Sequence, residues 1–301
     1  VGDAFDWAAS PYKPTPTIVQ AAQALYQGHN VQEISRSDAG AKNLSETATA
    51  ISQVIEKAKR HHEKCICFVT GVPGAGKTLA GLNITTDRMR SHEDEHAVFV
   101  SGNGPLVEVL REALARDQKE REGISKTDAK RKASAFIQNI HHFRDDNVRA
   151  EAPPIEKVVV FDEAQRAWDQ GSTAKFMQQK RQQQGFDLSE PEFLIQVMDR
   201  HKDWCVIVAL IGGGQEINTG EAGLPEWFSA LQRSFGHWHL YYSSQLKGNE
   251  YTQGVPLATQ VQGLKSEANP AMHLGVSVRS FRAEKLSEFV GCIIENEPEK
   301  A

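Results

Sequence analysis

The most constraining feature of the chain is a glycine-rich run that ends in Lys-Thr and lies between two apolar segments. Residues 65–84 read CICFVTGVPGAGKTLAGLNI, which places Gly71, Gly76, Lys77 and Thr78 in the spacing G-x-x-x-x-G-K-[ST]. The preceding segment is typical of a strand and the following one of a helix, so the run predicts a strand, a tight loop and a helix N-terminus. The alternative, a glycine turn that precedes Lys-Thr by chance, gives no reason for this context on both sides.

This loop has the chemistry of a phosphate-binding site. Its glycines let the backbone turn N–H groups toward the β- and γ-phosphates, and the helix N-terminus adds its dipole. Lys77 adds a point charge, and the Thr78 hydroxyl is a magnesium ligand. The sequence therefore predicts a nucleoside triphosphate site, whose loop residues are Gly71, Val72, Pro73, Gly74, Ala75, Gly76, Lys77 and Thr78.

An acidic pair follows a second apolar run. In PPIEKVVVFDEAQRAWD, residues 158–161 form a fully apolar segment typical of a buried parallel strand, and Asp162 and Glu163 come directly after it. Open α/β sheets bind ligands at the carboxyl ends of their strands. We expect Asp162 to contact magnesium through water and Glu163 to polarise the attacking water. The alternative is an exposed acidic turn at the start of a helix.

A third apolar run, WCVIVALI at 204–211, leads into Gly212, Gly213, Gly214, Gln215 and Glu216. A side-chain amide at a strand end can hydrogen-bond a γ-phosphate and report its loss, so Gln215 is a candidate γ-phosphate sensor. The alternative is that the glycines form only a turn. Neither a kinase nor a small GTPase gives a reason to expect glutamine here.

The order of apolar runs indicates the fold class. From residue 65 onward, short β-rich runs at 65–70, 97–100, 158–161, 206–211 and 238–242 alternate with helix-like segments. This alternation predicts an α/β fold with a parallel sheet between two layers of helices. Residues 1–64 read as mainly helical.

Three segments look like excursions from this core. Residues 116–132 are charged and typical of a solvated helical insertion, with a phosphate-binding patch as the alternative. The glutamine-rich residues 170–186 are expected to form a mobile loop, and residues 243–270, with scattered glycine and proline, a linker.

The composition of the chain argues against several classes of protein. With 34 Lys+Arg against 39 Asp+Glu, a net charge of -5 and a pI near 6.1, the chain has no global attraction for phosphate polymers, so a nucleic-acid site would be a local groove. Apolar runs are far shorter than the ~20 residues of a membrane-spanning helix, and no membrane partner is expected. The cysteines at 65, 67, 205 and 292 form no C-x-x-C pair and are expected to be buried thiols, so we expect a cytoplasmic protein.

The phosphate loop, the DEAQ box at 162–165 and the GGGQ strand end at 212–215 together resemble the first motor domain of a superfamily 1 helicase. FVSGNGPLVEVL at 99–110 and IHHF at 140–143 occupy the places of segments that touch single-stranded nucleic acid in that family. LGVSVRS at 274–280 resembles the motif that opens the second motor domain. The resemblance implies a RecA-like fold, ATP and Mg²⁺ as ligands, and Arg279 as an arginine that completes the site, with Arg282 as its rival.

More narrowly, TGVPGAGKT, DEAQRAWD and LIGGGQEINTGEAGLPEW resemble a bacterial group of helicase-like ATPases related to the helicase part of long Schlafen proteins. With the helical segment at 1–64 and the linker taken as 243–273, the resemblance implies a first RecA-like domain at 65–242 and a truncated second RecA-like domain at 274–301. In this group a further domain, sometimes a nuclease, often precedes the ATPase. A sequence that starts at Val1 and not at Met fits that arrangement. Two departures are that Gly213 replaces the usual aspartate of motif III and that no glutamine motif for adenine precedes the loop.

Two functional hypotheses follow. The first is a magnesium-dependent ATPase coupled to single-stranded DNA or RNA, and the second is a nucleotide-gated switch that controls an attached effector domain or partner protein. A nucleotide or small-molecule kinase is a poorer third, because it has no use for Gln215 or Arg279. In QEINTGEAGLPEW, Glu216 and Glu221 are expected to order the loop by hydrogen bonding, while Trp227 packs the following helix. The alternative is that Trp227 or Phe228 stacks on a nucleobase, and we favour packing.

Overall fold

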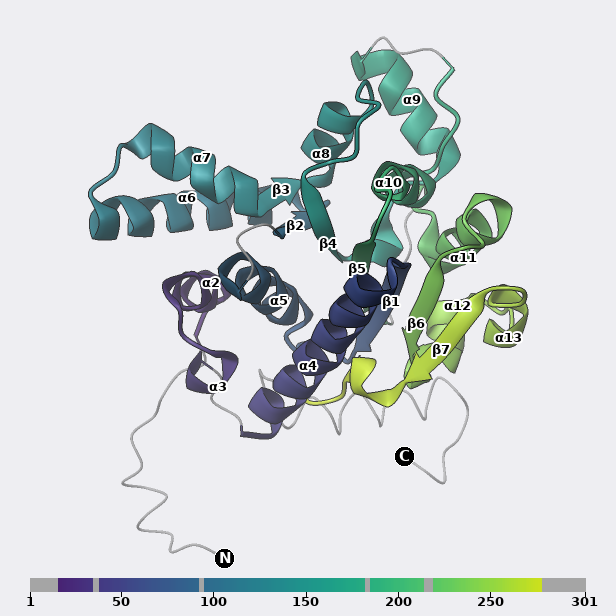
Figure 1. The fold of residues 1–301 in the computed structure, drawn as a ribbon, viewed down its shortest axis with the longest axis horizontal. Helices are drawn as coiled ribbons and strands as arrows, with labels where there is room; N and C mark the ends of the chain where they lie inside the picture. The colour runs from purple at the N-terminus through teal and green to yellow at the C-terminus, as the bar shows by residue number, and fades with distance from the viewer. Residues whose placement is uncertain (1–15, 35–37, 92–94, 182–184, 214–218, 278–301) are drawn as a thin grey trace, which may run out of the picture.

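A computed structural model describes residues 16–34, 38–91, 95–181, 185–213 and 219–277 of the chain (Figure 1). These residues form an eight-stranded sheet in which every pairing is parallel. The strands are β1 (Lys64–Gly71), β2 (His96–Ser101), β3 (Ile137–Asn139), β4 (Glu156–Asp162), β5 (Cys205–Gly212), β6 (His239–Ser243), β7 (Lys265–Asn269) and β8 (His273–Leu274). Their order is β3-β2-β4-β5-β1-β6-β7, and β8 pairs with β1.

The larger helices are α2 (Ile18–Gln27), α4 (Asp38–His61), α5 (Lys77–Ser91), α6 (Gly104–Glu122), α7 (Lys126–Phe136), α8 (Ile140–Asn147), α9 (Gln170–Arg181), α10 (Glu190–Asp199) and α11 (Gly223–Ser234). Short helical turns are α3 (Val31–Ile34), η1 (Ala164–Arg166), η2 (Ser244–Lys247), α12 (Asn249–Thr252), α13 (Leu257–Gln260) and η3 (Pro270–Met272). Successive side chains of a strand point to opposite faces of the sheet, and in the buried strands both sets are apolar. Helices therefore cover both faces of the sheet. Cys65, Cys67 and Val69 of β1 belong to a core cluster that also contains residues of α2, α4, α5, α6 and α7, whereas Ile66 and Phe68 belong to a second cluster with residues of α8, α10 and α11.

This architecture confirms the predicted α/β fold, with a parallel sheet between two helical layers. Each of the five predicted apolar runs from residue 65 onward coincides with a strand, the last beginning one residue before β6. The predicted helical character before residue 64 agrees with α2, α3 and α4, of which α4 packs on β1 and β5. No helix in the described ranges is long and apolar enough to cross a membrane.

The expectation of a linker at 243–273 is wrong for the described structure. Within this segment β7 extends the sheet by pairing with β6, and β8 reaches the end of β1. The side chains of β7 are mostly exposed, so this strand is held by backbone pairing and carries no apolar pattern that could predict it. The proposed start of a second domain lies mainly in 278–301, outside the described residues.

The expectation of a loop at 170–186 is also wrong, because α9 occupies residues 170–181. Glutamine is a good helix former, and Thr173 and Met177, four residues apart, bury one side of this helix.

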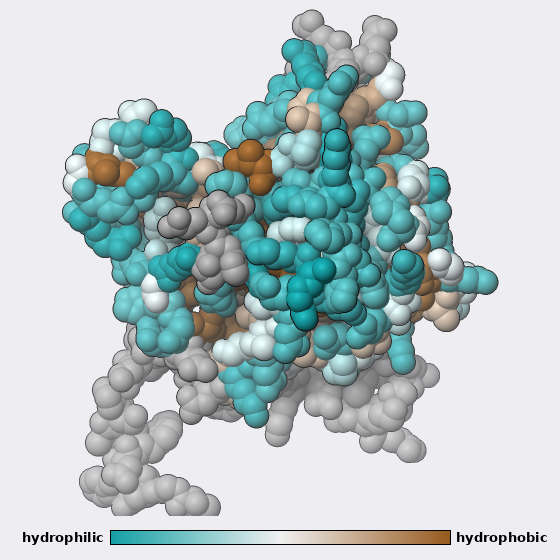
Figure 2. Space-filling model, viewed as in Figure 1, coloured by the Kyte–Doolittle hydropathy of each residue, from teal (hydrophilic) through white to brown (hydrophobic). Residues whose placement is uncertain are grey.

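The charged segment at 116–132 lies in a hairpin of α6 and α7 that projects from the sheet and has a largely hydrophilic surface (Figures 1 and 2). Asn103 caps the start of α6, and Gly123 ends it in the left-handed conformation that glycine favours. Basic side chains of this hairpin pair with its own carboxylates in Arg116–Glu112, Lys130–Glu112, Arg121–Asp117, Arg131–Asp128 and Lys132–Glu122. These pairs favour the solvated insertion over the phosphate-binding patch.

Candidate nucleotide site and its surroundings

The glycine-rich loop connects β1 to α5 as predicted. Gly74 and Gly76 have φ angles of 77° and 84°, which glycine adopts without steric cost. The Lys77 ammonium donates hydrogen bonds to the carbonyl oxygens of Gly71 at 3.0 Å and Val72 at 3.5 Å. A basic group therefore lies over the start of a loop whose helix N-terminus also favours anions.

Thr78 and Asp162, separated by 84 residues in sequence, meet at the carboxyl edge of the sheet. The Thr78 hydroxyl donates to Asp162 Oδ2 at 2.9 Å. Asp162 is only 2% exposed, and its other oxygen, Oδ1, is buried without a hydrogen-bond partner in the described residues. Burial, with the neighbouring Glu163 charge as the second cause, raises the pKa of Asp162 to about 7. A hydroxyl and an unsatisfied carboxylate oxygen side by side are donors that fit a hard cation such as Mg²⁺.

Glu163 follows directly in an unusual backbone conformation. Its φ and ψ of 55° and 44° are left-handed, which is uncommon for a residue with a side chain. Gln165 donates to Glu163 Oε2 at 2.6 Å and accepts a hydrogen bond from the backbone N–H of Gly212 at 2.9 Å. The DEAQ box is therefore tied to the end of β5, where the GGGQ segment begins.

Other predicted residues of this site are only partly described. Gly214, Gln215 and Arg279, like Arg282, lie outside the described residues, so their roles stay predictions. Gly213 is described, and a Cβ atom at this position would lie 2.5 Å from Tyr251 Oη. Tyr251 thus fills the space that an aspartate side chain would need, which explains why glycine stands at this position.

The segment after Gln215 packs against the DEAQ box. Trp227 is fully buried and its indole N–H donates to the Ala164 carbonyl at 3.0 Å, so packing is confirmed and base stacking is wrong for Trp227. Phe228 is also buried. Glu221 pairs with Arg166 at 3.0 Å, in agreement with the expected ordering role, whereas Glu216 lies outside the described residues.

The end of the described chain contributes contacts that the sequence did not indicate. The Val72 N–H donates to the Leu274 carbonyl at 3.0 Å, and a Cβ at Gly71 would lie 2.9 Å from Leu274 Cβ. Thr70 Oγ1 lies 2.9 Å from His273 Nδ1, and burial, followed by the Lys77 charge, lowers the pKa of His273. These residues support the base of the phosphate loop.

Both segments expected to touch nucleic acid lie on the same sheet edge as Asp162. Ser101 at the end of β2 is in register with Asp162 on one side and Asn139 on the other. Within IHHF, however, the side chains differ: Phe143 is buried in the core, whereas His142 is exposed. Phe143 is therefore not available for contact, and His142 is the exposed member of this segment.

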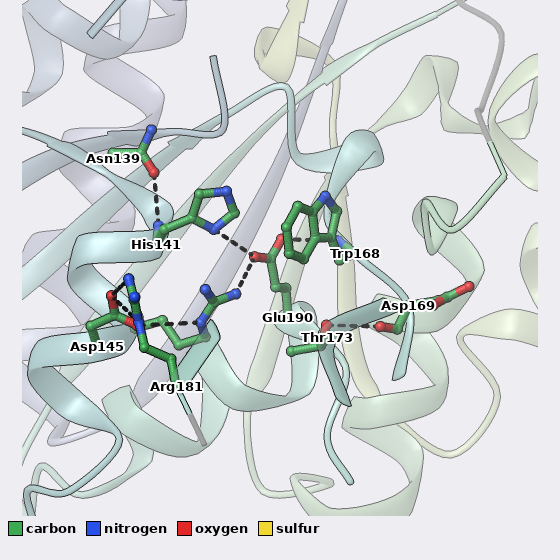
Figure 3. Close-up of polar contacts among 9 residues, drawn as sticks. Asn139, His141, Asp145, Trp168, Asp169, Thr173, Arg181 and Glu190 are labelled. Atoms are coloured by element: carbon green, nitrogen blue, oxygen red, sulfur yellow. Dashed lines mark hydrogen bonds and ion pairs between the residues drawn. The ribbon is translucent and has the colours of Figure 1, made fainter. Parts of the chain in front are cut away.

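His141 instead joins an aromatic and charged cluster that includes Trp168 and Glu190 (Figure 3). Its ring lies 4.6 Å from that of Trp168 and 5.3 Å from that of Phe176, the latter stacked at 17°. Burial, followed by the Arg144 charge, lowers the pKa of His141 to about 4, so the ring is neutral near pH 7.

The family model described as Schlafen group 3, DNA/RNA helicase domain, matches residues 64–301. None of the curated proteins compared with the chain matches it. Among solved structures, the chain is similar to the Hef helicase domain of Pyrococcus furiosus, with a TM-score of 0.36 and 18% identity, and the match covers 68% of this chain and 39% of that structure.

Proposed function

The chain belongs to the Schlafen group 3 DNA/RNA helicase-domain family, and on this premise we propose that it is a magnesium-dependent ATPase whose turnover is coupled to single-stranded DNA or RNA. The observation that carries this proposal is the contact between Thr78 and Asp162. It places a hydroxyl beside a buried carboxylate with one unsatisfied oxygen, next to a phosphate-binding loop.

Each residue of the site has a role in this proposal. Backbone N–H groups of the loop bind the phosphate oxygens, and Lys77 moves from the carbonyls of Gly71 and Val72 to the β- and γ-phosphates. Thr78 and Asp162 would hold Mg²⁺, which when bound would neutralise charge that develops on the phosphate oxygens. Glu163 orients the attacking water and accepts its proton.

The link from Glu163 through Gln165 to Gly212 supports a sensing role for the strand end of β5. We propose Gln215 as the γ-phosphate sensor and Arg279 as the arginine that completes the site. Single-stranded nucleic acid would lie across the strand ends near residues 101–105 and His142. The alternative function, a switch that controls an attached effector domain or partner protein, uses the same nucleotide chemistry without dependence on a polymer.

Steady-state ATP hydrolysis with and without mixed-sequence single-stranded DNA and RNA separates these functions. The proposal predicts hydrolysis that requires Mg²⁺ and rises several-fold with one polymer, and Glu163→Gln should bind nucleotide but lose turnover. Robust hydrolysis that is indifferent to both polymers would favour the switch. Absence of nucleotide binding would refute both.

A further inference from the structure

A fully buried ion pair lies beside Trp168, in the segment that follows the DEAQ box. Arg144 on α8 and Glu190, the first residue of α10, are 0% and 3% exposed, and Arg144 Nη1 lies 3.1 Å from Glu190 Oε1. Arg144 Nε and Nη2 make no hydrogen bond within the described residues. Desolvating two charges is costly, so a buried pair is weak evidence for stability, and its use is to be sought in what it positions.

Glu190 holds the backbone of Trp168 from both sides (Figure 3). Its Oε2 accepts the Trp168 N–H at 2.9 Å, and its own N–H donates to the Trp168 carbonyl at 3.0 Å. The Arg144 guanidinium lies 4.4 Å from the ring centroid of Phe176 and 5.7 Å from that of Trp168. Arg144 therefore fixes the carboxylate of Glu190 while packing on the aromatic rings around it.

Trp168 ends the turn that begins at Glu163. We call residues 163–168 the post-β4 turn; between its ends it contains only the short helix η1. The left-handed φ of Glu163 is a conformation that persists only where surrounding contacts hold it. The two hydrogen bonds between Glu190 and Trp168 anchor the opposite end of this turn from Glu163.

We propose that Glu190 is a positioning residue for Glu163: by accepting the Trp168 N–H it fixes the post-β4 turn, and Arg144 holds its carboxylate in place. This inference rests on the proposed ATPase function, in which Glu163 orients water. It assigns Glu190 an effect on turnover that is separate from nucleotide binding, because none of its contacts with the described residues involves the phosphate loop.

The test compares two neutral replacements of the ion pair in the whole chain. Arg144→Met with Glu190→Leu removes both charges and the acceptor for Trp168. Arg144→Met with Glu190→Gln removes both charges but keeps an acceptor. The Leu pair should lower kcat about 10- to 100-fold with little change in nucleotide affinity, and the Gln pair should restore most of this loss.

Thermal unfolding of both pairs checks that they fold, since a merely structural role would move Tm and leave kcat of the folded protein equal. If the Leu pair does not fold, Glu190→Asp, which keeps the charge and withdraws the acceptor by one methylene, should show the same fall in kcat at constant affinity. Glu192→Leu is the matched control, because Glu192 lies on α10 but pairs with Arg233 and should leave kcat unchanged.

One assay of ATP hydrolysis distinguishes failure of the positioning role of Glu190 from failure of the proposed ATPase function. Equal kcat in the Leu and Gln pairs, with active wild type and inactive Glu163→Gln, would overturn the positioning role alone. If wild type does not hydrolyse ATP, the proposed function fails and the inference falls with it.

Discussion

Replacing Asp162 by asparagine should stabilise the nucleotide-free protein at alkaline pH. The pKa of Asp162 is about 7 against an ordinary value of 3.8. At about 1.36 kcal/mol for each pH unit, ionising this buried group costs the folded state about 4 kcal/mol. Between the ordinary pKa of 3.8 and the folded-state pKa of about 7, the unfolded chain has lost the proton of Asp162 and the folded chain keeps it. The free energy of unfolding therefore falls as pH rises, and the full cost of ionising Asp162 is present above pH 7.

The side-chain amide of the Asp162→Asn variant can still accept the Thr78 hydrogen bond but carries no proton to lose. Denaturant unfolding of both proteins without Mg²⁺ or nucleotide should therefore give equal stability near pH 4 and an advantage of up to about 4 kcal/mol for Asp162→Asn near pH 8.5. Glu163→Gln is the companion variant: because the Glu163 charge is the second cause of the raised pKa, it should recover part of the advantage. If Asp162→Asn is no more stable than wild type at pH 8.5, ionising Asp162 does not destabilise the folded protein.

Three further predictions concern single side chains. Lys77→Ala should weaken ATP binding by about 1.5–3 kcal/mol in a titration with a fluorescent analogue, since a charged hydrogen bond to phosphate is lost, and unchanged affinity would contradict this role. Gly213→Ala should cost about 1–3 kcal/mol of unfolding free energy because its Cβ meets Tyr251, and Tyr251→Phe should relieve part of that cost; an additive double mutant would argue against the clash. His142→Ala should lower affinity for a labelled oligonucleotide in anisotropy measurements without changing Tm, whereas His141→Ala should lower Tm; equal oligonucleotide binding by wild type and His142→Ala would exclude that contact.

The central strands could be predicted because each is buried on both faces and reads as a short apolar run. The edge strand β7 could not, since its sequence KSEAN is polar and its place depends on backbone pairing with β6. The glutamine-rich α9 was missed for a related reason: composition alone indicated a loop, while the buried positions that make it a helix are Thr173 and Met177.

The candidate site likewise has features that local sequence motifs predict and features that they do not. The phosphate loop and the Asp162–Glu163 pair are local motifs that follow strands, so their meeting at one sheet edge followed from parallel topology. The contacts of Leu274 with Gly71 and of Glu190 with Trp168 join segments that no local pattern connects. Such long-range supports can be found only once the chain is folded.

The most direct test of the central claim is the release of phosphate from γ-labelled ATP by wild type and Glu163→Gln, each in Mg²⁺ and in EDTA. We expect release by wild type only in Mg²⁺, and at least ~100-fold slower release by Glu163→Gln at comparable ATP affinity. Equal release by both proteins, or release that survives EDTA, would contradict this expectation.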